Sequence, residues 1–338
     1  MATNIRDVAK AAGVSVATVS KVLNGYTTVS QKTKERVLRI VKETRFQPNA
    51  AARALVGRRS MTLGIYLTTG LTHPFFASIL SGMELALKAK GYDLIYLSQL
   101  TFNKDYSFVR HCQSRNVEGV VIFGFQEDDA YFKELLESGL PSIFIDMDIV
   151  GQRAGYISSD NVDAMCHSIS YLRELKHRRI AFIAGIVESY VGRLRYDGYK
   201  KGLEIAGLPF REDYVAHSIF TRESGYSAMN SLLELPPAER PTAVVCCSDM
   251  CAIGAIDAIR DAGLSVPGDI SVIGFDDIEL ARNVTPALTT IRQDMIAMGR
   301  KAVELLDELI VDEMFASPTA IVPTELIVRD TCAPAKEE

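Results

Sequence analysis

Aromatic, acidic and basic side chains follow several apolar runs of this 338-residue chain, at points where a strand would end. Aromatic rings stack on the apolar faces of sugars, while carboxylates and an arginine bind pairs of hydroxyl groups. The residues that could do this chemistry are His73, Phe75, Phe76, Asp146, Arg195, Phe220, Ser248 and Asp276. Together they predict a binding site for a polyhydroxylated molecule. Each is weak alone, since an aspartate at a strand end is as often a helix cap. Asp249 is expected to cap a helix from Met250, and Asp160 is expected to be a cap or a lobe junction.

Motifs for catalysis are absent from the sequence. It has no nucleophile elbow, no metal-ligand spacing and no Gly-rich phosphate loop, so we expect no catalytic residues, metal or cofactor. Of the six cysteines, Cys246, Cys247 and Cys251 lie in an apolar stretch and are expected to be core residues. No signal-peptide pattern or membrane-spanning run is seen, so a cytoplasmic location with reduced thiols is expected.

The first 60 residues are strongly basic, although the whole chain carries a net charge of −5. They hold twelve Lys/Arg and three acidic residues, a net charge of +9, which leaves −14 for the remainder. A basic module joined to an acidic body indicates contact with nucleic acid at one end. Charge alone also allows an acidic protein or a membrane as the partner.

Apolar spacing and caps predict three helices in this basic segment. Asn4 precedes the first helix, Ser15 caps a second over 16–23, and Ser30 caps a third. The first two are short and are joined by about three residues that include Gly13. This spacing fits a helix-turn-helix, whose second helix enters the major groove of DNA.

The outward face of the second predicted helix carries side chains suited to DNA. Val16 and Ala17 can offer methyl groups to thymine, and Lys21 can donate to guanine. Short hydrogen-bonding groups suited to phosphate oxygens belong to Asn4, Thr18, Ser20 and Asn24. The alternative is a plain three-helix bundle with a solvated charged face, which the charge and the turn spacing disfavour.

Residues 49–59 are helix-capable but too few to form a stable helix alone. We therefore expect them to fold only when docked on DNA or on a partner copy. Leu55 would then be an apolar side chain able to wedge into a base step from the minor groove. Packing of Leu55 against the body is an equal alternative.

Short β-rich runs alternate with helical stretches from Met61 onward. Two series of four strands are predicted, over 63–68, 93–98, 119–123 and 142–146, and then 180–184, 216–219, 243–247 and 271–275. This alternation indicates parallel sheets covered by helices on both faces, and two series indicate two similar α/β lobes. Ligands of such folds bind beyond the carboxyl ends of the strands, so the predicted site falls in a cleft between the lobes.

The chain resembles the LacI/GalR repressor family over nearly its whole length. Residues 5–15 and 17–24 resemble the family's headpiece, and residues 48–49 and 52–55 resemble its hinge helix. Residues 160–161, 178–183, 274–277 and 285–291 are similar to the family core.

The resemblance implies a homodimer bound to double-stranded, near-palindromic operator DNA. It implies base reading by Val16, Ala17 and Lys21, and minor-groove contacts by Asn49, Ala52, Arg53 and Leu55. It implies effector contacts at Asp146, Arg195, Phe220, Ser248 and Asp276, with Arg195 as the leading candidate. Two departures leave the effector open: His73 stands where an asparagine often precedes Pro-Phe-Phe, and Ser248 stands where some sugar-responsive members carry asparagine.

The fold class expected is α/β, with an N-terminal three-helix head and a hinge helix, then two doubly wound parallel-sheet lobes like those of periplasmic binding proteins. The implied ranges are 1–48 for the head, 49–60 for the hinge and 61–338 for the effector-binding and dimerisation core. Because the family's chain crosses between its lobes three times, the N-lobe takes about 61–160 and 293–322. The C-lobe takes about 161–291 and 323–330.

The leading interpretation is a sequence-specific transcription regulator, a repressor or an activator with the repressor favoured, controlled allosterically by a sugar or a related metabolite. It is expected to be cytoplasmic and nucleoid-associated, with no membrane partner. A sugar-binding transport receptor shares the lobes, but the basic head argues against it. An enzyme would need Asp146 and Asp276 as a carboxylate pair and has no other support. A protein corepressor on the body surface is a variant of the leading interpretation.

Overall fold

The computed structural model describes residues 4–23, 28–44, 46, 59–67, 73–98, 106–124, 130–315 and 317–336. The chain forms two compact units, Met1–Ser60 and Met61–Glu338. The predicted DNA-contacting residues Asn24, Asn49, Ala52, Arg53 and Leu55, and with them the hinge helix, lie outside the described residues. No helix in the described ranges is long and apolar enough to span a bilayer.

In the described part of the first unit, three helices pack around a small apolar core. They are α1 (Ile5–Ala12), α2 (Val16–Leu23) and α3 (Gln31–Thr44). Asn4 caps α1 as predicted, since its Oδ1 accepts two backbone N–H groups of the first turn at 2.9 and 3.1 Å. Gly13 ends that helix in the left-handed conformation, with φ of 60°. Each helix contributes a fully buried valine, namely Val8, Val19 and Val37.

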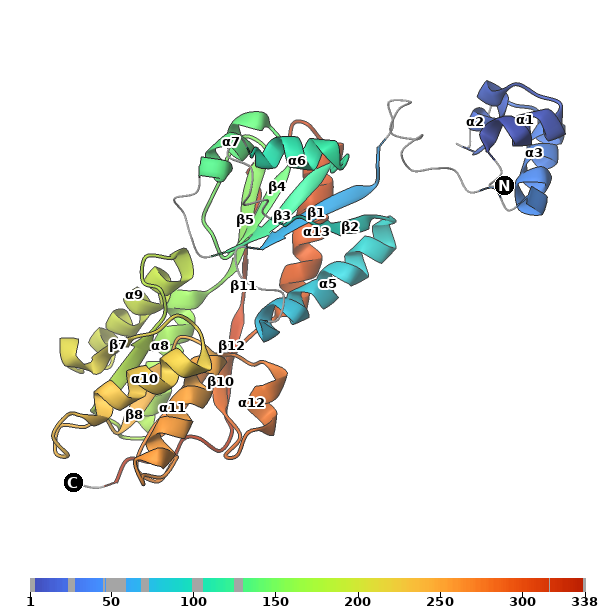
Figure 1. Cartoon of the computed structure of the whole chain (residues 1–338). Coiled ribbons are helices and arrows are strands. Elements are labelled where there is room, and N and C mark those ends of the chain that lie inside the picture. The colour runs from blue at the N-terminus through green and yellow to red at the C-terminus, as the bar shows by residue number, and fades with distance from the viewer. Residues whose placement is uncertain are drawn as a thin grey trace. The chain divides into compact units, whose positions relative to one another are not determined.

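The N-lobe of the second unit is a six-stranded parallel sheet (Figure 1). In sheet order its strands are β11 (Thr319–Val322), β5 (Ala154–Ser159), β4 (Ser142–Ile145), β3 (Gly119–Phe123), β1 (Thr62–Leu67) and β2 (Asp93–Tyr96). Its helices are α5 (Pro74–Lys90), α6 (Phe108–Ser114), α7 (Ala130–Ser138) and α13 (Met295–Val311). Helices α5 and α13 lie side by side, although about 200 residues separate them in the sequence.

The C-lobe is also six-stranded, and only its edge strand β12 is antiparallel. In sheet order its strands are β12 (Thr324–Ile327), β10 (Thr289–Gln293), β9 (Ser271–Asp276), β8 (Ala243–Cys246), β6 (Ile180–Ala184) and β7 (Val215–His217). Its helices are α8 (Asn161–Glu174), α9 (Tyr190–Ile205), the short η1 (Glu212–Tyr214), α10 (Arg222–Leu233), α11 (Asp249–Asp261) and α12 (Glu279–Asn283). The predicted core cysteines of this lobe, Cys246, Cys247 and Cys251, are fully buried.

The chain passes between the two sheets three times, after β5, after β10 and between β11 and β12. The first two crossings each enter a helix through an aspartate cap. Asp160 accepts the N–H of Asp163 at 3.2 Å, and Asp294 accepts that of Ala297 at 2.9 Å. The role predicted for Asp160 is therefore confirmed.

The predicted architecture of a helical head and two parallel-sheet lobes is confirmed for the described residues. All eight predicted strands form, with bounds within two residues of those expected. The sequence analysis missed β5, β10, β11 and β12 as strands. These short segments include many polar residues, and β11 and β12 are edge strands that pair with segments remote in the sequence.

Candidate DNA-binding face and effector cleft

Helix α2 presents the three candidate base-reading residues on one exposed face. Val16, Ala17 and Lys21 are exposed, whereas Val19 and Val22 turn into the head core. Ser15 precedes the helix, and its Oγ accepts the N–H of Thr18 at 3.2 Å and also hydrogen-bonds the Thr18 hydroxyl at 2.9 Å. Thr18 and Ser20 are half-buried beside this face. The oxygen of Asn4 serves as the α1 cap, so only its amide nitrogen remains for a phosphate.

The cleft residues meet where the strands of the two lobes end. They are His73, Phe75, Phe123, Asp146, Val191, Arg195, Phe220, Ser248 and Asp276. The cavity between them is about 20 Å³, which is room for a single water molecule. The space left between these side chains is therefore smaller than a sugar, and a larger ligand requires the lining to rearrange.

Phe76 is a correction to the predicted set. Its side chain is fully buried in the N-lobe core, where its ring lies 6.0 Å from that of Phe123. Phe75, the preceding residue on α5, lines the cleft together with Phe123, at a ring separation of 5.6 Å. Sequence analysis missed Phe123 and Val191, although Phe123 is the last residue of the predicted strand 119–123 and so stands at its carboxyl end.

Arg195 is the cation of the cleft and is 3% exposed. Its Nε donates to Oδ1 of Asn161 at 2.8 Å, and its Nη1 donates to the carbonyl of Cys247 at 2.5 Å. The guanidinium carbon lies 3.7 Å from the centre of the Phe275 ring. These contacts fix the plane of the guanidinium, because Arg195 is held on two edges and one face.

Two buried carboxyl groups face this single guanidinium. Ser158 donates to Oδ1 of Asp146 at 2.8 Å, and Nε2 of Gln293 donates to Oδ1 of Asp276 at 2.6 Å. Burial raises the pKa of Asp146, and it raises that of Asp276 well above its usual range, while Arg195 opposes both shifts. Because burial disfavours a second negative charge beside one guanidinium, the cleft has little excess charge of either sign, and it suits a neutral, hydroxyl-rich ligand better than an anion.

Three cleft residues adopt the left-handed backbone conformation that side chains usually avoid. The φ angles are 59° at Asp146, 64° at Phe220 and 127° at Asp276. Such conformations cost free energy and cluster at functional sites, where the surrounding structure holds them. All three follow or end a strand, so their side chains turn sharply at the strand ends and reach the cleft.

His73 brings two unused polar atoms to the cleft. Its Nδ1 and Nε2 are buried and have no hydrogen-bond partner among the described residues. Burial lowers the pKa of His73, and the nearby backbone of Phe220 opposes this shift. A neutral imidazole offers one donor and one acceptor, which together match a hydroxyl group.

Comparison with known proteins places this geometry in a family. Residues 4–49 match the lacI family of bacterial regulatory proteins, and residues 169–332 match the periplasmic binding protein-like domain. The regulator CelR of Thermobifida fusca is 32% identical over 96% of both chains. The repressor PurR of Erwinia tasmaniensis is 37% identical over 98% of this chain and 97% of its own. The chain belongs to the LacI family.

Solved structures of the LacI family agree with this assignment. A lac repressor dimer bound to operator and to the anti-inducer ONPF has a TM-score of 0.83 and 28% identity, and covers 98% of this chain and all of its own. A CelR–cellobiose complex has a TM-score of 0.72 and 30% identity over 97% of this chain and 99% of its own. This LacI-family chain is a DNA-binding transcription regulator, and the relatives it matches are regulators rather than enzymes.

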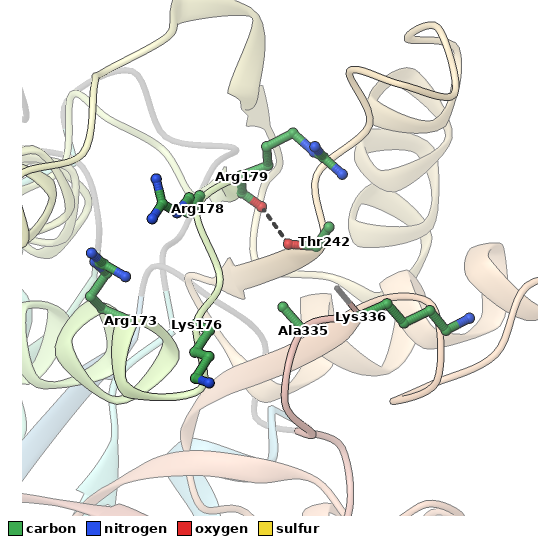
Figure 2. Close-up of a pocket in the computed structure, with 7 residues that line it drawn as sticks. All are labelled: Arg173, Lys176, Arg178, Arg179, Thr242, Ala335 and Lys336. Carbon is green, nitrogen blue, oxygen red and sulfur yellow. Dashed lines mark hydrogen bonds between the residues drawn. The ribbon is translucent and has the colours of Figure 1, made fainter. Parts of the chain in front are cut away.

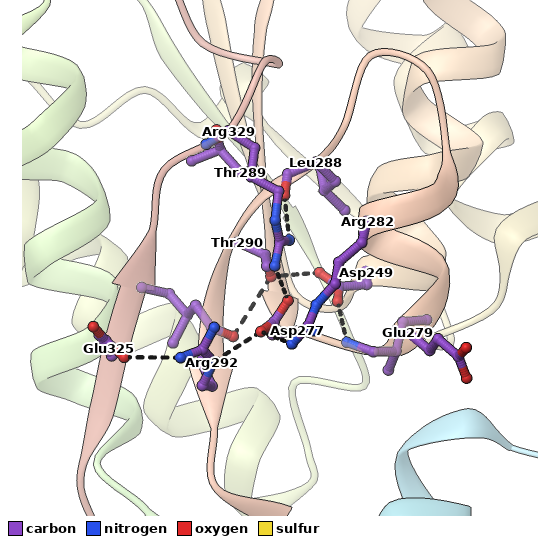
Figure 3. A network of polar contacts seen from close by, with 12 residues as sticks. Asp249, Asp277, Glu279, Arg282, Leu288, Thr289, Thr290, Arg292, Glu325 and Arg329 are labelled. Carbon is purple, nitrogen blue, oxygen red and sulfur yellow. Dashed lines mark hydrogen bonds and ion pairs between the residues drawn. The ribbon is translucent and has the colours of Figure 1, made fainter.

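Asp249 of this LacI-family regulator does not cap α11, contrary to the prediction. Ser248 is the cap, since its Oγ accepts the N–H of Cys251 at 3.2 Å. Asp249 is fully buried, and its two oxygens accept the Thr290 hydroxyl at 2.5 Å and the N–H of Ile278 at 2.9 Å (Figure 3). It therefore links α11 to β10 and to the start of α12 directly behind the cleft.

Asp249 should make the stability of the C-lobe depend on pH. Burial and the neighbouring Asp277 raise its pKa to about 7, whereas in the unfolded chain it is about 3.9. The native state then binds more protons between these values, so stability should fall as pH rises from about 4 to about 7 and level off above. We expect Asp249→Asn to reduce this slope in urea unfolding followed at pH 4.5, 6 and 7.5, and not to abolish it, because burial also raises the pKa values of Asp146 and Asp276.

The matched control for Asp249→Asn is Asp163→Asn, whose side chain is 59% exposed on α8. It should leave the slope unchanged. If the Asp249→Asn protein kept the full fall in stability between pH 4.5 and 7.5, the assignment of that slope to Asp249 would be wrong.

Proposed function

We propose that this regulator represses transcription by binding a near-palindromic operator as a homodimer, and that a neutral polyhydroxylated molecule in the cleft controls this binding. The head over 1–48 reads DNA, residues 49–60 link it to the core, and residues 61–338 bind effector and dimerise. The protein acts in the bacterial cytoplasm, at the nucleoid, because its operator is there. The observation that carries the proposal is the single guanidinium of Arg195 between two buried carboxyl groups.

The DNA half of the proposal rests on the exposed face of α2. Val16, Ala17 and Lys21 project from one side of a helix whose other side is anchored in the head core. The recognition helix of a helix-turn-helix places its first residues at base edges, and a lysine there donates to guanine O6 or N7. A lysine makes a less directional contact than an arginine fork, so we expect moderate selectivity at that base.

The effector half rests on the chemistry of the cleft. Phe75, Phe123 and Phe220 supply apolar faces, and Asp146, Arg195 and Asp276 supply groups that bind hydroxyl pairs. A Cβ at position 185 would lie 2.3 Å from Cζ of Phe220, so Gly185 is what lets that ring sit against β6. The cellobiose bound to the related CelR has the same chemical character.

Coupling between the two halves needs a change in the cleft that reaches the head. The lining side chains leave about 20 Å³, so effector binding requires the lining to rearrange, and we expect the lobes to move about the three crossings. Effector and operator then bind reciprocally, and a coupling free energy of roughly 1–3 kcal/mol changes operator affinity about 5- to 150-fold. A protein corepressor in place of the small molecule would leave Arg195 and the two carboxyl groups without a role.

The experiment that tests the proposal is operator binding in the presence of candidate effectors. Fluorescence anisotropy with genomic fragments around the gene of this protein should find one palindromic fragment bound in a salt-sensitive manner. Neutral sugars and sugar phosphates are then added in turn. A shift caused by a neutral sugar is the expected result; a shift caused only by a sugar phosphate would contradict the charge argument, and no specific binding would contradict the whole proposal.

Lys21→Ala should relax sequence preference at one operator position. The lost contact is to a base edge. The ratio of the affinity for the operator to the affinity for an operator mismatched at that position should therefore fall roughly tenfold, in line with about 1–3 kcal/mol per specific contact. A panel of single-base operator variants measures it. Lys42→Ala, on the last turn of α3, is the charge-matched control. Equal losses for all operators would assign Lys21 to the phosphates instead.

A further inference from the structure

A second open pocket lies at the opposite end of the C-lobe from the cleft. Its volume is about 450 Å³. It is lined by Arg173, Lys176, Arg178, Arg179, Thr242, Ala335 and Lys336 (Figure 2). Arg179 and Thr242 immediately precede β6 and β8, whereas the cleft residues follow the carboxyl ends of such strands. The sheet therefore separates the two pockets.

The charge of this pocket is opposite to that of its surroundings. The chain beyond residue 60 has a net charge of −14, yet five of the seven lining residues are arginine or lysine. None of the described residues that line it is acidic. Arg179 donates from Nε to the carbonyl of Arg240 at 2.9 Å, and Lys336 pairs with Asp269 at 2.7 Å. No described residue forms an ion pair or a side-chain hydrogen bond with Arg173, Lys176 or Arg178.

Helix termination accounts for only part of this cluster. Arg173 lies in the last turn of α8, where a cation interacts favourably with the helix dipole. Lys176 has φ of 67°, and the equivalent positions after α9 and α11 are Gly207 and Gly263, with φ of 65° and 73°. A glycine adopts this conformation with less strain than a lysine does. The lysine after α8 is therefore not explained by the way the helix ends. Arg178 lies beyond the helix altogether.

We propose that this pocket binds the phosphate chain of a small polyphosphate, either a nucleoside di- or triphosphate or an inorganic polyphosphate. Guanidinium groups bind phosphate oxygens in pairs, and lysine adds a point charge. A concave site of 450 Å³ has the size of a small-molecule site. The regulator thus has a second, anionic ligand site that is distinct from its sugar-type cleft.

The test is calorimetric titration of the full chain with tripolyphosphate and, separately, with ATP. The basic head also attracts anions, so two double variants with equal charge loss are compared. Arg173→Ala with Arg178→Ala removes two of the five basic side chains that line the pocket, and Arg36→Ala with Arg39→Ala changes two exposed residues of α3. Each lost charge-assisted contact weakens binding about tenfold or more, so the pocket pair should lose roughly 100-fold and the head pair should lose little.

Lys176→Gly separates ligand binding from structure. It removes the charge and also relieves the left-handed strain, so the protein should be at least as stable while tripolyphosphate binding weakens about tenfold. Binding of both probes supports a site for the phosphate chain, and binding of ATP alone supports a nucleotide site. Equal losses in the pocket and head pairs, unchanged affinity in the pocket pair, or binding of duplex DNA alone at the pocket would overturn the proposal.

Discussion

An Arg195→Ala protein is expected to bind its operator with unchanged affinity but to lose its response to effector. The substitution removes the only cation that lines the described cleft and leaves Asp146 and Asp276 facing each other without a counter-charge. Effector affinity should fall at least about 100-fold, since charge-assisted hydrogen bonds each contribute roughly 1.5–3 kcal/mol. Calorimetric titration with the effector found in the operator assay measures the loss directly.

Arg195→Lys is the informative companion to this variant. It keeps the positive charge, but lysine lacks the planar guanidinium fork. It therefore cannot donate to Asn161 and to the Cys247 carbonyl in the arginine geometry while it also binds a ligand. We expect an intermediate loss of affinity. Arg193→Ala, two residues earlier on α9 and about 43% exposed, is the control and should respond normally. A normal effector response in Arg195→Ala would remove Arg195 from the binding site.

Asp277→Ala is expected to lower the free energy of unfolding of the second unit by about 3 kcal/mol. The side chain of Asp277 is 1% exposed and accepts from three arginines: Arg292 at 2.8 Å, Arg282 at 3.3 Å and Arg329 (Figure 3). Burial alone would raise the pKa of Asp277, but the hydrogen bonds from Arg329 and Arg292 outweigh it, so the pKa is lowered. Most of the loss should come from Arg329, which is itself 14% exposed and would be left without its carboxylate.

Urea unfolding of the variant and of two partners checks this prediction. Arg282→Ala removes a 60%-exposed partner and should cost less than about 1 kcal/mol, whereas Arg329→Ala should approach the cost of Asp277→Ala. Because the native pKa is lowered, the contribution of Asp277 is present above about pH 4 and is lost as pH falls below that value. A cost for Asp277→Ala no larger than that for Arg282→Ala would contradict a structural role for the network.

The sequence by itself determined the elements whose signals are local. The head helices were predicted because Asn4, Ser15 and Ser30 are caps next to apolar positions at helical spacing. Strands β3 and β6 were predicted with their observed bounds, because a buried parallel strand is a continuous apolar run. Arg195 and the strand-end aspartates were found because parallel strands bring their carboxyl ends to one edge.

The tertiary structure alone decided which neighbours those residues meet. Phe75 and Phe76 are adjacent on α5 and point about 100° apart, so the orientation of α5 over the sheet decides that Phe75 lines the cleft and Phe76 lies in the core. Asp249 resembles a helix cap in the sequence, but the preceding residue, Ser248, caps α11. Asp249 instead accepts hydrogen bonds from Thr290 and Ile278, which lie 29 or more residues away in the sequence. Strands β11 and β12 lie at sheet edges, and each pairs with a segment more than 30 residues away. Pairing, rotation and burial of this kind depend on the whole chain, so no local pattern encodes them.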